Sequence, residues 1–188
     1  ENGGRVDLYG GSRETVQPGI EYGGSTENLT YFLSNSYLMN NIGIENPTSS
    51  ANPLHDHSEQ NKGFGYLSYA VNPTNRLTMM YGSYDGWFQI PNRSGQPADP
   101  NGLGFLAGAG VSSFDSAALR DRQYENNRYG ILAWQSSIGS DIDTQFAFFN
   151  RTSQVHFRPD LVGDLVFNGI ASDVLRSNVS NGVQADIT

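Results

Sequence analysis

The stretch that decides the fold is SNVSNGVQADIT (residues 177–188). Its apolar residues are Val179, Val183, Ala185 and Ile187, and its polar residues are Asn178, Ser180, Gln184 and Asp186. This alternation places the two sets on opposite faces of a β-strand. Residues 16–22 repeat the pattern, with Gln17 and Glu21 on the polar side. Both segments therefore predict strands with two chemically different faces.

Eight segments have the length and residue types of strands. We expect them at Arg5–Ser12, Thr15–Gly24, Leu29–Asn40, Lys62–Asn72, Arg76–Pro91, Arg128–Ser140, Thr144–Arg158 and Leu175–Thr188. Short turns are expected at Ser25–Asn28, Asn72–Asn75 and Ser140–Asp143, and long polar loops at Asn41–Asn61, Asn92–Asn127 and Pro159–Arg176. Short turns at one end of the strands and long loops at the other are typical of a transmembrane β-barrel of the outer-membrane type.

The composition argues against several other classes of protein. No stretch approaches the roughly 18 consecutive apolar residues of a membrane helix. The chain has no cysteine, so a disulfide framework or a thiolate metal site is not expected. A net charge of −8 argues against nonspecific nucleic-acid binding. Residues 1–20 contain no charged segment followed by an apolar run, so we expect a mature chain or a part of a longer one.

The loop after Pro91 contains two further patterns. Asp115–Arg122 begins with residues that cap helices and continues with Ala and Leu, which predicts a short surface helix. The glycines upstream of it resemble a phosphate-binding loop, but they follow no buried strand and lack the GK[ST] ending. We therefore expect a flexible loop around Gly102, Gly104, Gly108 and Gly110.

His55-Asp56-His57 is the pattern closest to a metal site. Two imidazoles and a carboxylate can bind zinc or copper. On an extended segment, however, His55 and His57 point to opposite sides, and Glu59 is the further ligand nearby. We expect a hydrogen-bonded loop here and a structural role for His156. No GxSxG elbow, HExxH helix or nucleophile–base pair is present, so we expect neither enzymatic activity nor a cofactor.

Six blocks of the sequence resemble, in the same order, the early barrel of TonB-dependent outer-membrane receptors. They are NNIGIENPT (40–48), PLHDH (53–57), KGFGYLSY (62–69), FQIPN (88–92), FRPD (157–160) and GDLVFNGIA (163–171). The resemblance implies the wall of a plugged barrel of about 22 strands in the outer membrane of a Gram-negative bacterium. Residues 1–188 would be about eight antiparallel strands of this wall, without the plug domain and without the C-terminal strands.

The same resemblance implies a function and a set of partners. The receptor would import a scarce ligand (siderophore-bound iron, a corrinoid, a glycan or a peptide) by energy-coupled active transport. Its plug would contact the TonB complex, and lipopolysaccharide and lipid would surround the wall. Long extracellular loops would hold the ligand, with contacts expected from His55, Asp56, His57, Gln89 and Asn92.

Two other interpretations fit the strand pattern. A self-contained eight-stranded barrel acting as an adhesin or anchor requires Leu175–Thr188 to pair with Arg5–Ser12. A soluble carbohydrate-binding β-sandwich would use exposed Trp and Tyr side chains. The receptor interpretation instead expects those two strands to be separate edges of an open sheet, because each would pair with further strands.

Overall fold

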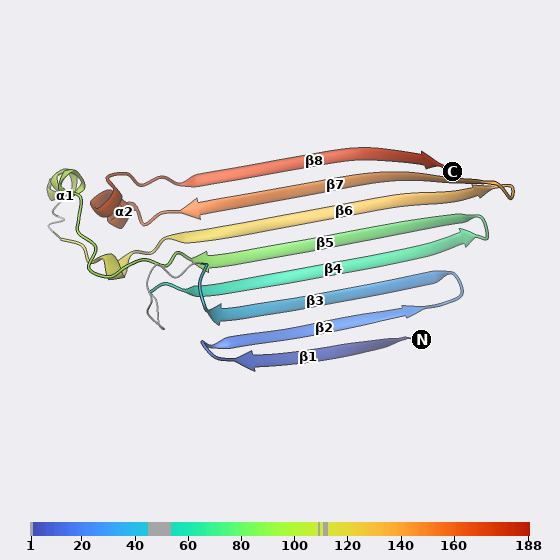
Figure 1. Ribbon diagram of the computed structural model, residues 1–188, viewed down its shortest axis with the longest axis horizontal. Coiled ribbons are helices and arrows are strands. Elements are labelled where there is room, and N and C mark those ends of the chain that lie inside the picture. The colour runs from blue at the N-terminus through green and yellow to red at the C-terminus, as the bar shows by residue number, and fades with distance from the viewer. Residues whose placement is uncertain (1, 45–53, 109, 111–112) are drawn as a thin grey trace.

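The computed structural model describes residues 2–44, 54–108, 110 and 113–188. Eight strands form one sheet, and each strand is antiparallel to the next in the order β1 to β8 (Figure 1). The strands are β1 (Gly3–Gly11), β2 (Thr15–Ser25), β3 (Leu29–Asn41), β4 (His57–Asn72), β5 (Asn75–Gln89), β6 (Arg122–Ile138), β7 (Ile142–Arg158) and β8 (Val174–Ile187). The predicted all-β class and the eight predicted strands are confirmed. The block at residues 40–48 lies partly outside the described residues, because residues 45–53 are not among them.

The two edge strands lie at opposite sides of the sheet. β1 pairs with β2 and β8 pairs with β7, and β1 and β8 do not pair with each other (Figure 1). The sheet is therefore open. This confirms the expectation that the first and last strands are separate edges, and it leaves the closed eight-stranded alternative without the pairing that it requires.

The two ends of the sheet carry connections of different length. The β2–β3, β4–β5 and β6–β7 turns lie at one end, and the long connections lie at the other end together with the short β1–β2 turn (Figure 1). Local chemistry makes the short turns tight. The Asn72 carboxamide accepts a hydrogen bond from the Thr74 amide at 3.0 Å, and Gly139 has a φ of 69°. Arg13 and Glu14, both with a φ of 56°, form the β1–β2 turn.

Directly opposite residues in an antiparallel sheet share a face, so the strand register assigns every side chain to one of two faces. We name them after two neighbouring residues of β8, the Val183 face and the Gln184 face. Two adjacent rows on the Val183 face contain only apolar or aromatic side chains, and we call them the apolar band. One row is Tyr31, Leu67, Met79, Leu132, Phe148 and Val183, and the other is Leu29, Tyr69, Leu77, Trp134, Phe146 and Ala185.

Most of the apolar band is uncovered. Ten of its twelve side chains are exposed, and Leu29 and Tyr31 are half-buried. Ionisable acidic, basic and histidine side chains of the strands on the Val183 face all lie toward the long-loop end, namely His57, Glu59, Asp85, Arg122, Arg128, His156 and Arg158. The Gln184 face instead carries charge along its whole length, with Arg5, Asp7, Glu21, Lys62, Arg76, Glu125, Arg151, Arg176 and Asp186. The predicted two-faced character of β2 and β8 is confirmed by this register.

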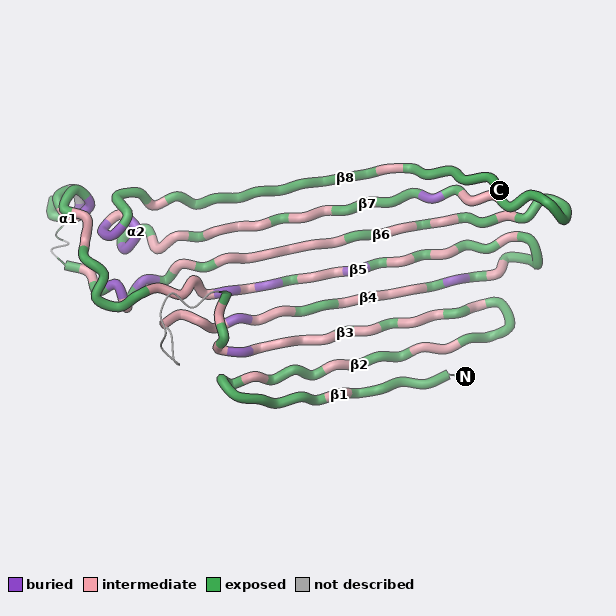
Figure 2. The backbone as a smooth tube through the Cα atoms, viewed as in Figure 1, coloured by how far each residue is buried: buried purple, intermediate pink, exposed green. Residues whose placement is uncertain are grey.

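The buried apolar cluster of the described residues lies beyond the sheet, among the long connections (Figure 2). Helix α1 (Pro100–Ala107), a 3₁₀ turn (Ser116–Ala118) and helix α2 (Leu161–Asn168) form it. Its buried members are Leu106, Leu119, Val166 and Phe167, and we call this cluster the loop core. Among the described residues, no helix is long and apolar enough to cross a bilayer.

Two predictions for this region are wrong. The expected flexible glycine loop contains α1, and Gly102 lies inside that helix. A Cβ at residue 102 would collide with the Leu165 carbonyl oxygen of α2, so the two helices pack this closely only with glycine at this position. Close packing of two helices thus overrides the low helix propensity of glycine. The helix expected at Asp115–Arg122 is only the 3₁₀ turn, although the Asp115 side chain does cap it. It is not a surface element, because Ser116 and Leu119 are buried.

Candidate functional site

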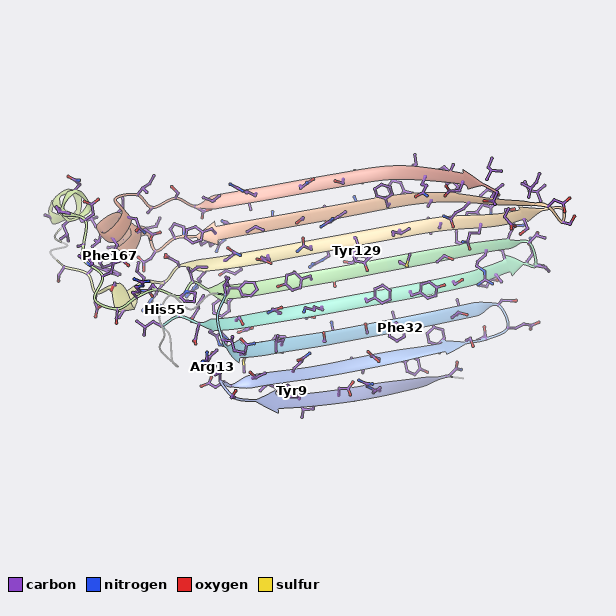
Figure 3. All side chains as sticks on the ribbon, in the orientation of Figure 1. Tyr9, Arg13, Phe32, His55, Tyr129 and Phe167 are labelled. Carbon is purple, nitrogen blue, oxygen red and sulfur yellow. The ribbon has the colours of Figure 1, made fainter. Side chains whose placement is uncertain are left out.

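The predicted site residues lie at the long-loop end of the sheet, where Figure 3 labels His55. Leu54 and Asn92 form a backbone bridge, which brings the β3–β4 connection against the start of the β5–β6 connection. The imidazole Nδ1 of His55 lies 2.6 Å from the Asn92 side-chain oxygen. The Asn92 amide group in turn donates to the Ser116 carbonyl oxygen at 2.5 Å. The side chains of His55 and Asn92 therefore link the β3–β4 connection to the β5–β6 connection, and within the latter Asn92 also contacts the turn that carries Ser116.

His57 is the first residue of β4 and belongs to a different set of contacts. Its Nδ1 lies 2.7 Å from the Asn41 side-chain oxygen, and its Nε2 lies 3.1 Å from a Glu59 carboxylate oxygen. Its backbone N–H donates to the Gln89 side-chain oxygen at 3.2 Å. Both ring nitrogens are thus engaged, and a metal ion at His57 would displace one of these hydrogen bonds.

The five residues expected to contact a ligand therefore do not form one cluster. Four of them form two pairs, and Asp56 belongs to neither pair. His55 lies with Asn92, and His57 lies with Gln89. Asp56 packs beside Gly43, which has a φ of 74°, and a Cβ at residue 43 would lie 3.0 Å from the Asp56 Cβ. The described residues contain no group of three His, Asp or Glu that could hold a metal ion. Ligand binding by these five residues stays a prediction.

Sequence reasoning missed a row of aromatic residues just inside the long-loop end. Trp87 of β5, Tyr124 of β6 and His156 of β7 lie side by side on the Val183 face. Trp87 and His156 lay within predicted strands, but Tyr124 did not, because β6 begins at Arg122 and not at the predicted Arg128. Residues 122–128 show no apolar/polar alternation, because Tyr124 is the one non-polar side chain among them, so the sequence carries no signal that would extend the β6 prediction.

A hollow of about 430 Å³ lies against this row. Its lining combines aromatic rings with amide and charged groups, which suits a polar ligand that also has apolar faces. The side chains around it include Tyr37, Glu59, Asn61, Asp85, Trp87, Tyr124, Asn126, Gln154, His156 and Arg158. The structure thus offers a binding surface at the long-loop end that the five predicted residues only border.

The carboxylates of Asp121, Asp160 and Asp164 lie near one another at the N-terminal end of α2. Asp160 caps the helix by accepting from the amides of Val162 and Gly163, and its own amide donates to Asp121 at 2.7 Å. Burial, and next the nearby charge of Asp121, raise the pKa of Asp164 to about 6. Burial also raises the pKa of Asp121. The ionised forms of Asp121 and Asp164 are therefore both disfavoured at this end of the helix.

No family model, no curated protein and no solved structure matches the chain.

Proposed function

We propose that this chain forms part of the wall of a TonB-dependent outer-membrane receptor. The receptor would import siderophore-bound iron, a corrinoid, a glycan or a peptide by energy-coupled transport. The apolar band is the observation that carries the proposal, together with the six sequence blocks described above. The band extends from β3 to β8 on one face of a single sheet and includes no charged side chain.

An exposed apolar surface of this extent requires a cover, because soluble monomers rarely expose contiguous apolar patches larger than a few hundred Å². Leu132 and Val183, for example, have side chains that are 47 % and 67 % exposed. Lipid chains would cover the band and remove it from water. The Gln184 face, with charges from Arg5 to Asp186, would then face the interior of the barrel.

The open edges support a barrel with more strands than these eight. Each unpaired backbone group in hydrocarbon has an unfavourable free energy of several kcal/mol, so the free edges of β1 and β8 need partners in a membrane. Further strands would supply these partners in a wall of about 22 strands. A plug domain inside that wall would contact the TonB complex in the periplasm.

The arrangement of the connections supports an orientation with the long loops outside the cell. The loop core, His55, Asp56, His57, Gln89 and Asn92 would then lie on the extracellular side, where the imported ligand enters. Of the two alternatives, the closed small barrel needs a β1–β8 pairing that the open sheet lacks. The β-sandwich needs a second layer over the apolar band, and the described strands form only one sheet.

Site-directed spin labelling tests the proposal, because residues 1–188 contain no cysteine and any cysteine elsewhere in the gene product can be replaced by serine. The product of the complete gene carrying Val183→Cys is labelled with a nitroxide in lipid bilayers, and Gln184→Cys is the matched control on the adjacent residue. The label at 183 should collide more often with dissolved oxygen than with a water-soluble nickel complex, and the label at 184 should show the reverse. Similar access of the nickel complex to both positions would contradict the proposal.

A further inference from the structure

Two arginines lie directly opposite each other at the long-loop end of the Val183 face. Arg122 is the first residue of β6 and Arg158 is the last residue of β7, and the register pairs them. Both side chains are exposed. Like charges directly opposite in an antiparallel pair destabilise the sheet. This placement therefore requires a compensating contact.

Aromatic rings supply part of this contact. The guanidinium carbon of Arg122 lies 5.9 Å from the centre of the Trp87 ring, and that of Arg158 lies 5.3 Å from the centre of the Tyr124 ring. Trp87 and Tyr124 are themselves directly opposite on β5 and β6. The two rings attract the cations and fix their positions. They do not neutralise the charge.

The neighbouring carboxylates are already engaged by other cations or imidazoles. Glu59 pairs with His57 at 3.1 Å, Asp85 with Arg128 at 2.7 Å, and Asp173 with His156 at 2.6 Å. Within the described part of the chain, neither Arg122 nor Arg158 forms an ion pair with a carboxylate. The two guanidiniums are thus an adjacent pair of positioned, exposed cations with no acidic partner from these residues.

We propose that Arg122 and Arg158 bind a sugar phosphate in the headgroup of an outer-leaflet glycolipid, and that the adjacent hollow takes the sugar. Guanidinium groups bind phosphate through paired N–H···O bonds, which suits a doubly charged oxyanion between two arginines. The hollow beside them, about 430 Å³ in volume, offers Trp87 and Tyr124 as stacking surfaces. Amide groups of Asn126 and Gln154 at its rim can hydrogen-bond to sugar hydroxyls.

The position of the pair selects the class of ligand, and this step rests on the proposed function. Arg122 lies on the same strand as Leu132 of the apolar band, about 33 Å away along the strand at roughly 3.3 Å per residue. With a strand tilt of about 40°, this is roughly 25 Å nearer the cell exterior. That height lies beyond the hydrocarbon and within the layer of headgroup sugars. The Val183 face at this height would meet neighbouring glycolipids, whereas a transported ligand would meet the Gln184 face.

Tryptophan fluorescence can report binding at this place, because Trp87 lies in the lining of the hollow. The part of the emission that is lost in a Trp87→Phe variant comes from the ring beneath Arg122. The product of the complete gene, in detergent, is titrated with a rough-type lipopolysaccharide that carries phosphates on its core sugars. We expect a saturable change in Trp87 emission. Arg122→Gln with Arg158→Gln should weaken the apparent affinity about tenfold or more, because two charge-assisted contacts are lost.

Arg151→Gln is the matched control, since Arg151 lies on β7 with Arg158 but on the Gln184 face, and it should leave the titration unchanged. If the double variant loses the β-sheet circular dichroism spectrum, Arg122→Lys and Arg158→Lys replace it. Each keeps the charge but not the paired N–H donors and should weaken binding severalfold. Affinity unchanged in the folded variants would overturn the proposal.

Two further binding measurements identify the chemical class of the ligand. The same lipopolysaccharide without its core phosphates should bind far more weakly, and equal binding would overturn the role of phosphate. Inorganic phosphate should not compete at matched concentrations; effective competition would overturn the glycolipid assignment and indicate a soluble phosphate ligand. These titrations in detergent do not depend on which face meets lipid. A failure of the spin-label test at Val183 is therefore distinguishable from a failure at Arg122 and Arg158.

Discussion

Val183 of β8 lies directly opposite Phe148 of β7, and the two side chains are 67 % and 45 % exposed. The pair belongs to the apolar band, and a contiguous apolar surface of that extent indicates a missing neighbour. Under the proposed function this neighbour is lipid, and the pair lies within the hydrocarbon layer.

Val183→Arg should therefore destabilise the membrane-inserted protein by about 2–4 kcal/mol if the residue lies near the bilayer midplane. Gln184→Arg introduces the same charge one residue away, on the face that carries Arg151 and Asp186, and should have a much smaller effect. Urea unfolding of the complete gene product from lipid vesicles measures both changes. Equal loss of stability in the two variants would contradict the assignment of the faces.

Gly102→Ala should loosen the loop core. The new methyl group would meet the backbone carbonyl of Leu165, so α1 must move away from α2. We expect a loss of about 1–3 kcal/mol in the free energy that protects α1 from opening, as for other overpacked sites. Gly104→Ala is the control in the same helix, because a Cβ there meets nothing within 4 Å. Hydrogen exchange of residues 100–107 should become faster in the first variant only.

The stability of α2 should depend on pH through Asp164. Burial raises its pKa from 3.8 to about 6, so the folded helix binds this proton more tightly than the open form does. The stabilisation is fully present below about pH 3.8 and is lost as the pH rises through about 6. Between pH 4 and 7 the free energy of opening α2 should fall by about 1–3 kcal/mol.

Hydrogen exchange of residues 161–168, corrected for intrinsic rates, measures this effect. Asp164→Asn keeps an oxygen that can accept from Asn168, which donates to Asp164 at 2.9 Å in the native protein. It should protect α2 at pH 7 and remove most of the pH dependence. Asp141→Asn, in the β6–β7 turn at the other end of the sheet, should change neither property. A pH dependence that persists in Asp164→Asn would assign the titration to another group.

His55 and His57 should not form a tight metal site. His55 contacts Asn92, whereas His57 contacts Asn41 and Glu59, so the two imidazoles serve different partners. Calorimetric titration with zinc or copper should show no binding tighter than that of a solvated histidine pair. Submicromolar binding that His55→Ala abolishes would contradict this expectation.

The sequence predicted the sheet well because its signal is local. Alternation in residues 16–22 and 177–188 depends only on which side of the strand each residue faces, and the register confirms both assignments. The turn at Asn72–Asn75 was predicted correctly, because the effect of Asn72 on the backbone also acts within a few residues. The β6–β7 turn begins at Gly139, one residue before the predicted Ser140–Asp143.

The loop core could not be predicted in this way. Gly102 lies in a helix because Leu165, far along the chain, packs against it, and a window of sequence around Gly102 contains no trace of that contact. The geometry of the candidate site could not be predicted either, because it also depends on contacts between residues far apart in the sequence. The pairing of Arg122 with Arg158 depends on the β6–β7 register near the long-loop end. There β7 ends at the predicted Arg158, but β6 begins six residues before the predicted Arg128, within a polar stretch that resembles a loop. The contacts of His55 with Asn92 likewise join two connections separated by two whole strands.

The order β1 to β8 has a consequence for how the chain acquires its structure. Each strand pairs only with its neighbours in sequence, so hairpins can zip together one after another without any strand waiting for a distant partner. Even the long β5–β6 connection slows this little, since each doubling of loop length adds only about 0.6 kcal/mol to the free energy of closure. Leu119 comes from the β5–β6 connection and Val166 from the β7–β8 connection, so the loop core links the long-loop ends of four neighbouring strands in addition to their backbone pairing.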